Sequence, residues 1–456
     1  MTLAHAAPRD IPRMNAAPER AALVRLGALG AALVGLTVLG LALVAGRPAG
    51  NPGTGRTLAV VAVQLAAGAV YLAAAALVLR RGLPRRAVWV VLAAAAAMRA
   101  LLAPIAPPLS SDLYRYVWDG RVQAAGINPY RFVPADPRLA FLRDGTVFPR
   151  INRARTAPTI YPPMAELVFA AAGRIAPGVG GMKAVMLGAD LLTIGALLAL
   201  LRQAERPAAQ VLLYAWAPLP VWEFAGNGHV DALAAALVTL ALLVAARSRR
   251  GLTGMLLAAA TLVKFLPAAI APAFWRRWDL RLVAAFVATV ALLYAPYLGV
   301  GARVFGFLPG YATQEGLASG RGVFLLDLLR LAVPLPGWAG AAYAAALALV
   351  LLALALRFGF GPALPAAPPD RVLVLARQAS VLGAVALVGV SPHYPWYFGW
   401  LVPLVCLAPS PALLYLVAGS VLLTLDPVHH LGIAALVYLP TATLALWQRH
   451  TLRSRR

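Results

Sequence analysis

Long runs of apolar residues are the feature that most limits how this chain can fold. Residues 21–46, 57–79, 87–106 and 279–298 are clear examples, and about 20 such residues suffice to cross a bilayer as a helix. The whole chain is 61% hydrophobic and only 12% charged, whereas soluble domains carry roughly 25% charged residues. A transmembrane barrel would instead show short segments of alternating hydrophobicity. The pattern therefore predicts an all-α polytopic membrane protein.

Charge and cysteine content exclude several other classes of protein. The formal net charge is +24, but the arginines lie at the ends of the apolar runs rather than in one soluble patch, which argues against nucleic-acid binding. Cys406 is the single cysteine, so neither an intrachain disulfide nor a cysteine-based metal site can form. The chain contains no ATP-binding loop and no GxGxxG fingerprint. The run 21–46 is too long for a cleaved signal peptide, and we interpret it as a signal anchor.

The distribution of arginine predicts which loops face the cytoplasm, because short basic loops stay on that side. On this rule, residues 1–20 form a cytoplasmic tail, residues 21–448 a single transmembrane domain, and residues 449–456 a basic cytoplasmic tail. The domain has about twelve spans. The alternation is kept only if the chain turns back as a re-entrant hairpin at Lys264–Pro267, which is tolerated where protein covers the irregular backbone. The large loop 107–181 then lies outside, on the same face as the other polar clusters.

A dense polar stretch, SSDLYRYVWDGRVQAAGINPYRF, occupies residues 110–132 of that loop. Asp112 comes soon after an apolar run, so we expect it at the membrane–water boundary, just beyond the end of a helix. A carboxylate there can accept a proton from a hydroxyl nucleophile, and the neighbouring arginines have the planar fork of donors that suits a phosphate. Alternatively, Asp112 and Asp119 are ordinary loop charges that pair with nearby arginines.

Three further side chains could act on a substrate. Tyr161 precedes two prolines and a predicted amphipathic helix in residues 159–175; it could bond a phosphate or sugar, or only anchor the chain at the interface. His393 lies in the aromatic segment SPHYPWYFGW; it could donate to an anionic leaving group, or belong to an aromatic belt. Lys264 lies at the predicted bend and could meet a lipid phosphate or bond the freed carbonyls.

Other ionisable residues are less informative. The segments GNGHVD (226–231) and DPVHH (426–430) contain histidine and aspartate, but their spacing matches no known metal site. Arg99 and Asp190 lie within predicted spans, where ionisable groups are functional by default. Arg99 could instead extend along the helix to the outer surface.

Together these residues resemble the type C glycosyltransferases, which are integral membrane enzymes that use polyprenyl-phosphate sugars. The resemblance rests on an aspartate-bearing first outer loop, a Tyr-Pro-Pro stretch, a Lys-x-x-Pro break and a late His-x-Pro-Trp-Tyr motif, and it covers residues 87–448. It is closest to bacterial polyprenol-phosphate-mannose-dependent mannosyltransferases, including glycosyltransferase family 87. The first loop is also similar to that of the catalytic subunit of eukaryotic GPI mannosyltransferase I, at Asp112, Gly126, Pro129 and Tyr130. Some relatives have Asp-x-Asp there, whereas position 114 is tyrosine.

The resemblance implies an inverting transfer of a hexose, most simply mannose, from a polyprenyl-phosphate sugar to a lipid- or glycan-linked acceptor. It places the enzyme in the bacterial cytoplasmic membrane, with its active site on the extracytoplasmic side. Asp112 would be the general base, with Asp119 as a second catalytic candidate. No cofactor is implied, and a divalent metal is not indicated. The residues that would hold the donor phosphate or substrate are Arg121, Tyr161, His393, Lys264, Arg131 and Tyr130.

Two other functions fit the same composition. A transporter or flippase of lipid-linked sugars would share the helices and basic loops, but it should show an internal repeat and broken helices deep in the bilayer. A non-catalytic assembly factor for envelope polysaccharide would not need the polar cluster around Asp112.

Overall fold

The computed structural model describes residues 16–46, 54–80, 83–314, 316, 319–425 and 431–453, whose regular elements are all helical. Seven helical segments of this part of the chain are long and apolar enough to cross a membrane. The protein is thus a multi-pass membrane protein, as predicted. The seven segments lie in α1 (Ala16–Val44), α2 (Thr54–Arg80), α6 (Val179–Gln203), α12 with η6 and α13 (Leu280–Gln314), α15 (Ala339–Gly359), α16 (Pro368–Val390) and α19 (Leu431–Arg453).

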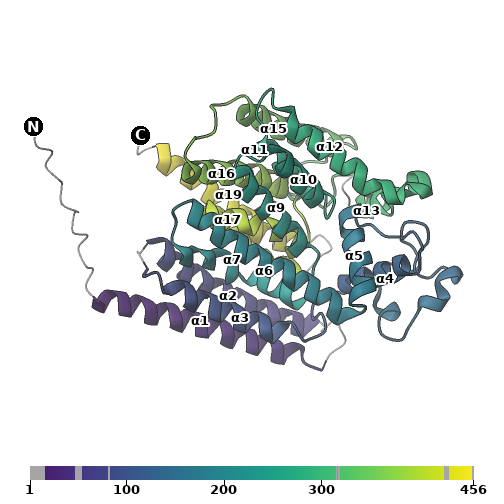
Figure 1. Ribbon diagram of the computed structural model, residues 1–456, viewed down its shortest axis with the longest axis horizontal. Helices are drawn as coiled ribbons and strands as arrows, with labels where there is room; N and C mark the ends of the chain where they lie inside the picture. Colours follow the sequence, from purple (N-terminus) through teal and green to yellow (C-terminus); the bar gives the residue numbers. More distant parts are fainter. Residues whose placement is uncertain are drawn as a thin grey trace, which may run out of the picture.

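Shorter apolar helices complete the body. α1 lies along one edge in Figure 1, α15 lies near the opposite edge, and α6, α7 and α9 run between them. The apolar run 207–224, which we count among the twelve predicted spans, is broken into short pieces, since Pro218 and Pro220 cannot donate backbone hydrogen bonds. The count of twelve spans therefore stays a prediction. The shorter elements are α3 (Ala87–Leu102), η3 (Ala208–Val211), α7 (Leu212–Ala215), α8 (Pro218–Pro220), η4 (Val221–Gly226), α9 (Asp231–Ala246), η7 (Pro395–Leu401), α17 (Val402–Leu407), α18 (Pro411–Gly419) and η8 (Ser420–Thr424).

The chain doubles back where the hairpin was predicted. α10 (Arg250–Thr261) is followed by a turn at Lys264, then by η5 (Leu266–Ile270) and α11 (Ala271–Phe274). The guanidinium of Arg250 donates to the carbonyl of Phe274 at 3.1 Å, so the two ends of this segment lie together.

Three basic loops, at residues 247–250, 276–281 and 358–371, lie against one another. The arginine distribution predicts that all three are cytoplasmic. The Arg277 backbone N–H donates to the Gly359 carbonyl at 3.1 Å. The Arg371 guanidinium donates to the Ala246 carbonyl at 3.1 Å and to the Ser248 hydroxyl at 2.6 Å. These three basic loops therefore meet in the structure, and their placement on the cytoplasmic side stays a prediction.

The large loop 107–181 is more regular than expected. It contains α4 (Asp112–Ala124), η1 (Pro137–Leu142), η2 (Phe148–Arg150) and the predicted amphipathic helix, α5 (Pro163–Ile175). In Figure 1 these elements form a lobe at one end of the body, beside α13 (Leu308–Gln314). Gly120 and Gly173 let α4 and α5 approach closely, since a Cβ on Gly120 would meet the Phe169 carbonyl oxygen at 2.4 Å.

The intramembrane arginine is paired rather than extended to the surface. Arg99 Nε lies 2.6 Å from Asp190 Oδ2, and Tyr214 donates to the other carboxylate oxygen at 2.7 Å. Both charged side chains are buried. The interpretation that Arg99 reaches the outer surface is therefore wrong. The pair ties α3 to α6, and removal of either partner would leave a buried charge without compensation.

Candidate active site

Asp112 is the first residue of α4 and the centre of a polar cluster. Its carboxylate accepts a hydrogen bond from the Asn152 side chain at 3.0 Å, and the Tyr161 hydroxyl lies 3.5 Å from the other oxygen. Asp112 was expected just beyond the end of a helix. It lies instead at the start of one, because α3 ends at Leu102 and the chain turns before α4. The partial positive charge of a helix N-terminus favours a carboxylate at this position.

Burial and nearby groups shift the pKa of the Asp112 carboxyl in opposite directions. Burial raises the pKa of Asp112 above its ordinary value, and this rise is opposed first by the charge of Lys264, then by the hydrogen bond from Asn152 and the charge of Arg153. A carboxylate with a raised pKa is a better proton acceptor than a solvated one. The arrangement therefore suits a general base.

Lys264 lies at the bend after α10 and is fixed by two contacts. Its ammonium donates to both oxygens of Asp231 at 2.9 and 3.0 Å, and it lies 3.7 Å from the centroid of the Tyr397 ring. Asp231 is the first residue of α9 and is fully buried, whereas the Lys264 side chain remains 16% exposed. The ammonium of Lys264 thus stays partly accessible while the carboxylate of Asp231 is buried. This arrangement would allow Lys264 to bind an anionic ligand.

Residues far apart in sequence form another part of the cluster. The hydroxyl oxygens of Tyr311, in α13, and Tyr397 lie 2.6 Å apart. Arg153 donates to Gln314 at 2.9 Å and lies over the Tyr311 ring at 5.7 Å. The backbone of Arg153 has φ 54, a left-handed conformation that is uncommon for non-glycine residues and often marks functional sites.

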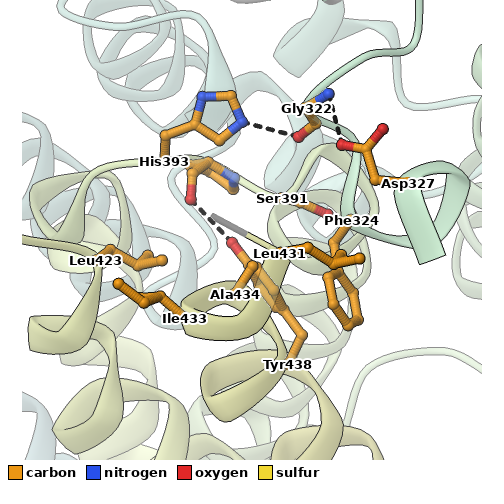
Figure 2. A pocket seen from close by; sticks show the side chains of 11 residues that line it. Gly322, Phe324, Asp327, Ser391, His393, Leu423, Leu431, Ile433, Ala434 and Tyr438 are labelled. Carbon is orange, nitrogen blue, oxygen red and sulfur yellow. Dashed lines mark hydrogen bonds between the residues drawn. The ribbon is translucent and has the colours of Figure 1, made fainter. Parts of the chain in front are cut away.

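His393 lies near this cluster and lines a pocket together with Asp327 and Tyr438. Figure 2 shows its Nε2 directed at the carbonyl oxygen of Gly322, 2.8 Å away, while the Gly322 N–H donates to Asp327. His393 also lines a second pocket together with Tyr311 and Tyr397. The histidine therefore borders the same region as Lys264, through the Tyr397 ring that they share.

Asp119 lies apart from these contacts. Arg115 Nε is 2.9 Å from both of its carboxylate oxygens, and both side chains are buried. Glu166 lies beside this pair and accepts from Thr159 at 2.6 Å. Burial, followed by the charge of Asp119, raises the pKa of Glu166 well above its ordinary value. This network joins α4 to α5 and supports the segment that carries Tyr161.

The remaining predicted phosphate ligands have other partners. Arg121 forms an ion pair with Asp144 at 2.6 Å, which is the pairing of loop charges weighed as an alternative. Arg131 lies over the ring of Phe132. Tyr130 donates its hydroxyl to the Tyr161 carbonyl at 2.7 Å, so it holds the backbone of a residue that contacts Asp112. The structure brings together Asp112, Tyr161, Lys264 and, through Tyr397, His393.

Several residues of the cluster were not predicted. Asn152 and Arg153 had no local signal beyond their place in the loop. Asp231 was visible in GNGHVD, but it was considered only as a metal ligand. Within the described residues, no group of three or more histidine, cysteine, aspartate or glutamate side chains could hold a metal ion.

Comparison with known proteins gives one match. A family model described as alpha-(1->6)-mannopyranosyltransferase, N-terminal domain, matches residues 21–278, which is more than half of the chain. The matched region contains Asp112, Tyr161, Asp231 and Lys264 but ends before His393. No curated protein and no solved structure matches the chain.

Proposed function

The chain belongs to the alpha-(1->6)-mannopyranosyltransferase family, and on that premise we propose that this membrane mannosyltransferase uses a polyprenyl-phosphate mannose as donor. The observation that carries the proposal is a partly buried carboxylate, Asp112, under the electrostatic influence of a cation, Lys264, that could meet a lipid phosphate. No nucleotide-binding motif is present, which agrees with a donor that lacks a nucleotide.

The proposed reaction is a single displacement at the anomeric carbon. A hydroxyl oxygen of the acceptor forms the new bond to C1 of mannose, and Asp112 takes the hydroxyl proton. The bond from C1 to the phosphate oxygen breaks at the same time, and the polyprenyl phosphate leaves with the electron pair. This displacement inverts C1. An α-linked product, which the family description names, then requires a β-linked donor.

Cations and donors near the cluster would stabilise the leaving phosphate. Lys264 and Arg153 both act on the Asp112 carboxyl electrostatically, so each lies within reach of a group bound beside it. Tyr161 and His393 add hydroxyl and imidazole donors at the edge of the same region. Positioned donors of this kind contribute most when they face the charge that develops in the transition state.

The proposed site lies at the outer end of the helical body. Three basic loops meet one another away from the Asp112 cluster, and the positive-inside rule assigns such loops to the cytoplasm. We therefore place the reaction on the extracytoplasmic face of a bacterial cytoplasmic membrane, where a lipid-linked donor and a glycan or glycolipid acceptor can meet.

The test is a transfer assay with purified protein in detergent. Labelled polyprenyl-phosphate mannose and polyprenyl-phosphate glucose are offered in parallel with a mannose-bearing acceptor. The wild type should transfer mannose, and Asp112→Asn should lower turnover by at least about 100-fold, because general bases typically contribute that much or more, while donor binding persists. Movement of intact donor across liposomes without transfer would instead support a flippase. Normal turnover of Asp112→Asn would show that another group is the base.

A further inference from the structure

A buried histidine in the segment after η4 has no role in the mechanism above. His229 is fully buried, and neither of its ring nitrogens has a hydrogen-bond partner among the described residues. Its Nδ1 lies 3.8 Å from Glu223 Oε2, beyond hydrogen-bond distance. Buried polar groups are nearly always hydrogen-bonded, so a histidine with two free nitrogens needs an explanation.

The groups around His229 are those that bind sugars. The Trp396 ring meets the imidazole edge to face, with centroids 4.1 Å apart, and stacks on Tyr394 at 4.6 Å. Glu223 is held in place by Asn227, which donates to it at 2.8 Å. Aromatic faces pack against the C–H faces of a sugar ring, while carboxylate and imidazole groups bond its hydroxyls.

The same segment adjoins the proposed phosphate site. Asp231, two residues beyond His229, is the residue that binds Lys264. Burial, followed by the charge of Lys264, lowers the pKa of His229 well below its ordinary value. A neutral imidazole has one donor and one acceptor nitrogen, so it can either donate a hydrogen bond to a sugar hydroxyl or accept one from it.

We propose that His229, Glu223 and Trp396 form the subsite that binds the hexose of the donor, with its phosphate at Lys264. This inference rests on the proposed function and adds the residues that recognise the sugar. Trp396 packs against the imidazole of His229, so a bound hexose would replace part of the contact between these two rings. A hydroxyl of the hexose would then pair with a ring nitrogen that is now unpaired.

The test separates sugar recognition from phosphate and lipid binding. Dissociation constants are measured for a polyprenyl-phosphate mannose and for the same polyprenyl phosphate without sugar. The dissociation constant of the sugar-free lipid divided by that of the mannose lipid measures how much the hexose contributes to binding. His229→Phe keeps a ring for Trp396 to pack against but removes both nitrogens, and we expect it to reduce the ratio about 3- to 10-fold, the loss typical of one hydrogen bond. Glu223→Gln should act in the same direction.

The control is Gln64→Leu, since Gln64 is also buried and also has unpartnered polar atoms, but it lies in α2. It should leave the ratio unchanged. An unchanged ratio in both His229→Phe and Glu223→Gln, with wild-type melting temperatures, would overturn the subsite, as would a wild type that binds both lipids equally. Absence of mannose transfer by the wild type is a separate result, which would refute the proposed function.

Discussion

Lys264 and Asp231 should move the pH dependence of transfer in opposite directions. If Asp112 is the base, kcat/KM falls as the pH drops through its pKa, because only the ionised carboxyl accepts a proton. The charge of Lys264 lowers the pKa of Asp112, and the like charges of Asp112 and Asp231 oppose each other, since the charge of Asp112 raises the pKa of Asp231. Lys264→Met removes the cation and leaves Asp231 without a partner. The pKa of Asp112 should then rise, and activity should be lost at a higher pH than in the wild type.

The size of this change follows from the contacts of Lys264. A neighbouring charge of opposite sign typically lowers the pKa of a carboxyl by about one to three pH units. Lys264 is already bound to Asp231 at 2.9 Å and is partly exposed, so its effect on Asp112 is partly cancelled and screened. We therefore expect the pKa of Asp112 to rise by about one pH unit in Lys264→Met, near the lower limit of this range. At pH values below the pKa, kcat/KM should then be about tenfold lower than in the wild type.

Asp231→Asn supplies the matched experiment. It leaves Lys264 without its carboxylate partner, so the pKa of Asp112 should fall and the acid limb should move to lower pH. The double variant Lys264→Met, Asp231→Asn removes both charges and should lie between the two single variants. The assay is the pH profile of kcat/KM for mannose transfer. Movement of both single variants in the same direction, or of neither, would refute the assignment of Asp112 as the titrating base.

Three further predictions test separate parts of the structure. His393→Ala should lower turnover by about tenfold to a thousandfold, as expected for loss of a donor to a leaving oxyanion, without a lower melting temperature; near-wild-type turnover would leave the motif as an aromatic belt. Asp279→Cys in a Cys406→Ser background should resist an impermeant thiol reagent added to intact cells, and labelling would exclude the cytoplasmic placement of that loop. Gly120→Ala should lower the free energy of unfolding by about 1–3 kcal/mol through overpacking against α5, whereas Gly145→Ala, where an added Cβ meets nothing within 4 Å, should not; equal melting temperatures would contradict the close approach.

The apolar runs predicted most of the helices, because a bilayer requires long apolar segments whatever their tertiary contacts. The hairpin at Lys264 followed from the arginine distribution, and the chain does double back there. α4 was not predicted. Its residues Tyr116, Trp118 and Asp119 are buried, yet such polar and aromatic residues in an outer loop have the composition of an exposed segment. Their burial depends on packing against α5 and Phe148, and this tertiary contact has no local sequence pattern.

Some residues of the candidate site could be predicted one by one, but their assembly could not. Asp112 stood out because carboxylates are rare in such a chain, and Lys264 because it lay at a break in the helices. Its pairing with Asp231 depends on the packing of α9 against the bend. Arg121 has the same chemistry as Arg153, and only the fold shows that Arg121 is held by Asp144 while Arg153 acts on Asp112.

The contacts of Tyr397 have a consequence for how this enzyme can diversify. The proposed base, Asp112, and the cation, Lys264, both belong to the region that the family model matches, whereas Tyr311, Tyr397 and His393 lie beyond residue 278. The aromatic contact between Lys264 and Tyr397 joins these two parts of the polypeptide at the proposed reaction centre. On the proposed mechanism, changes in the second part can alter which substrate is accepted without replacing the group that takes the proton.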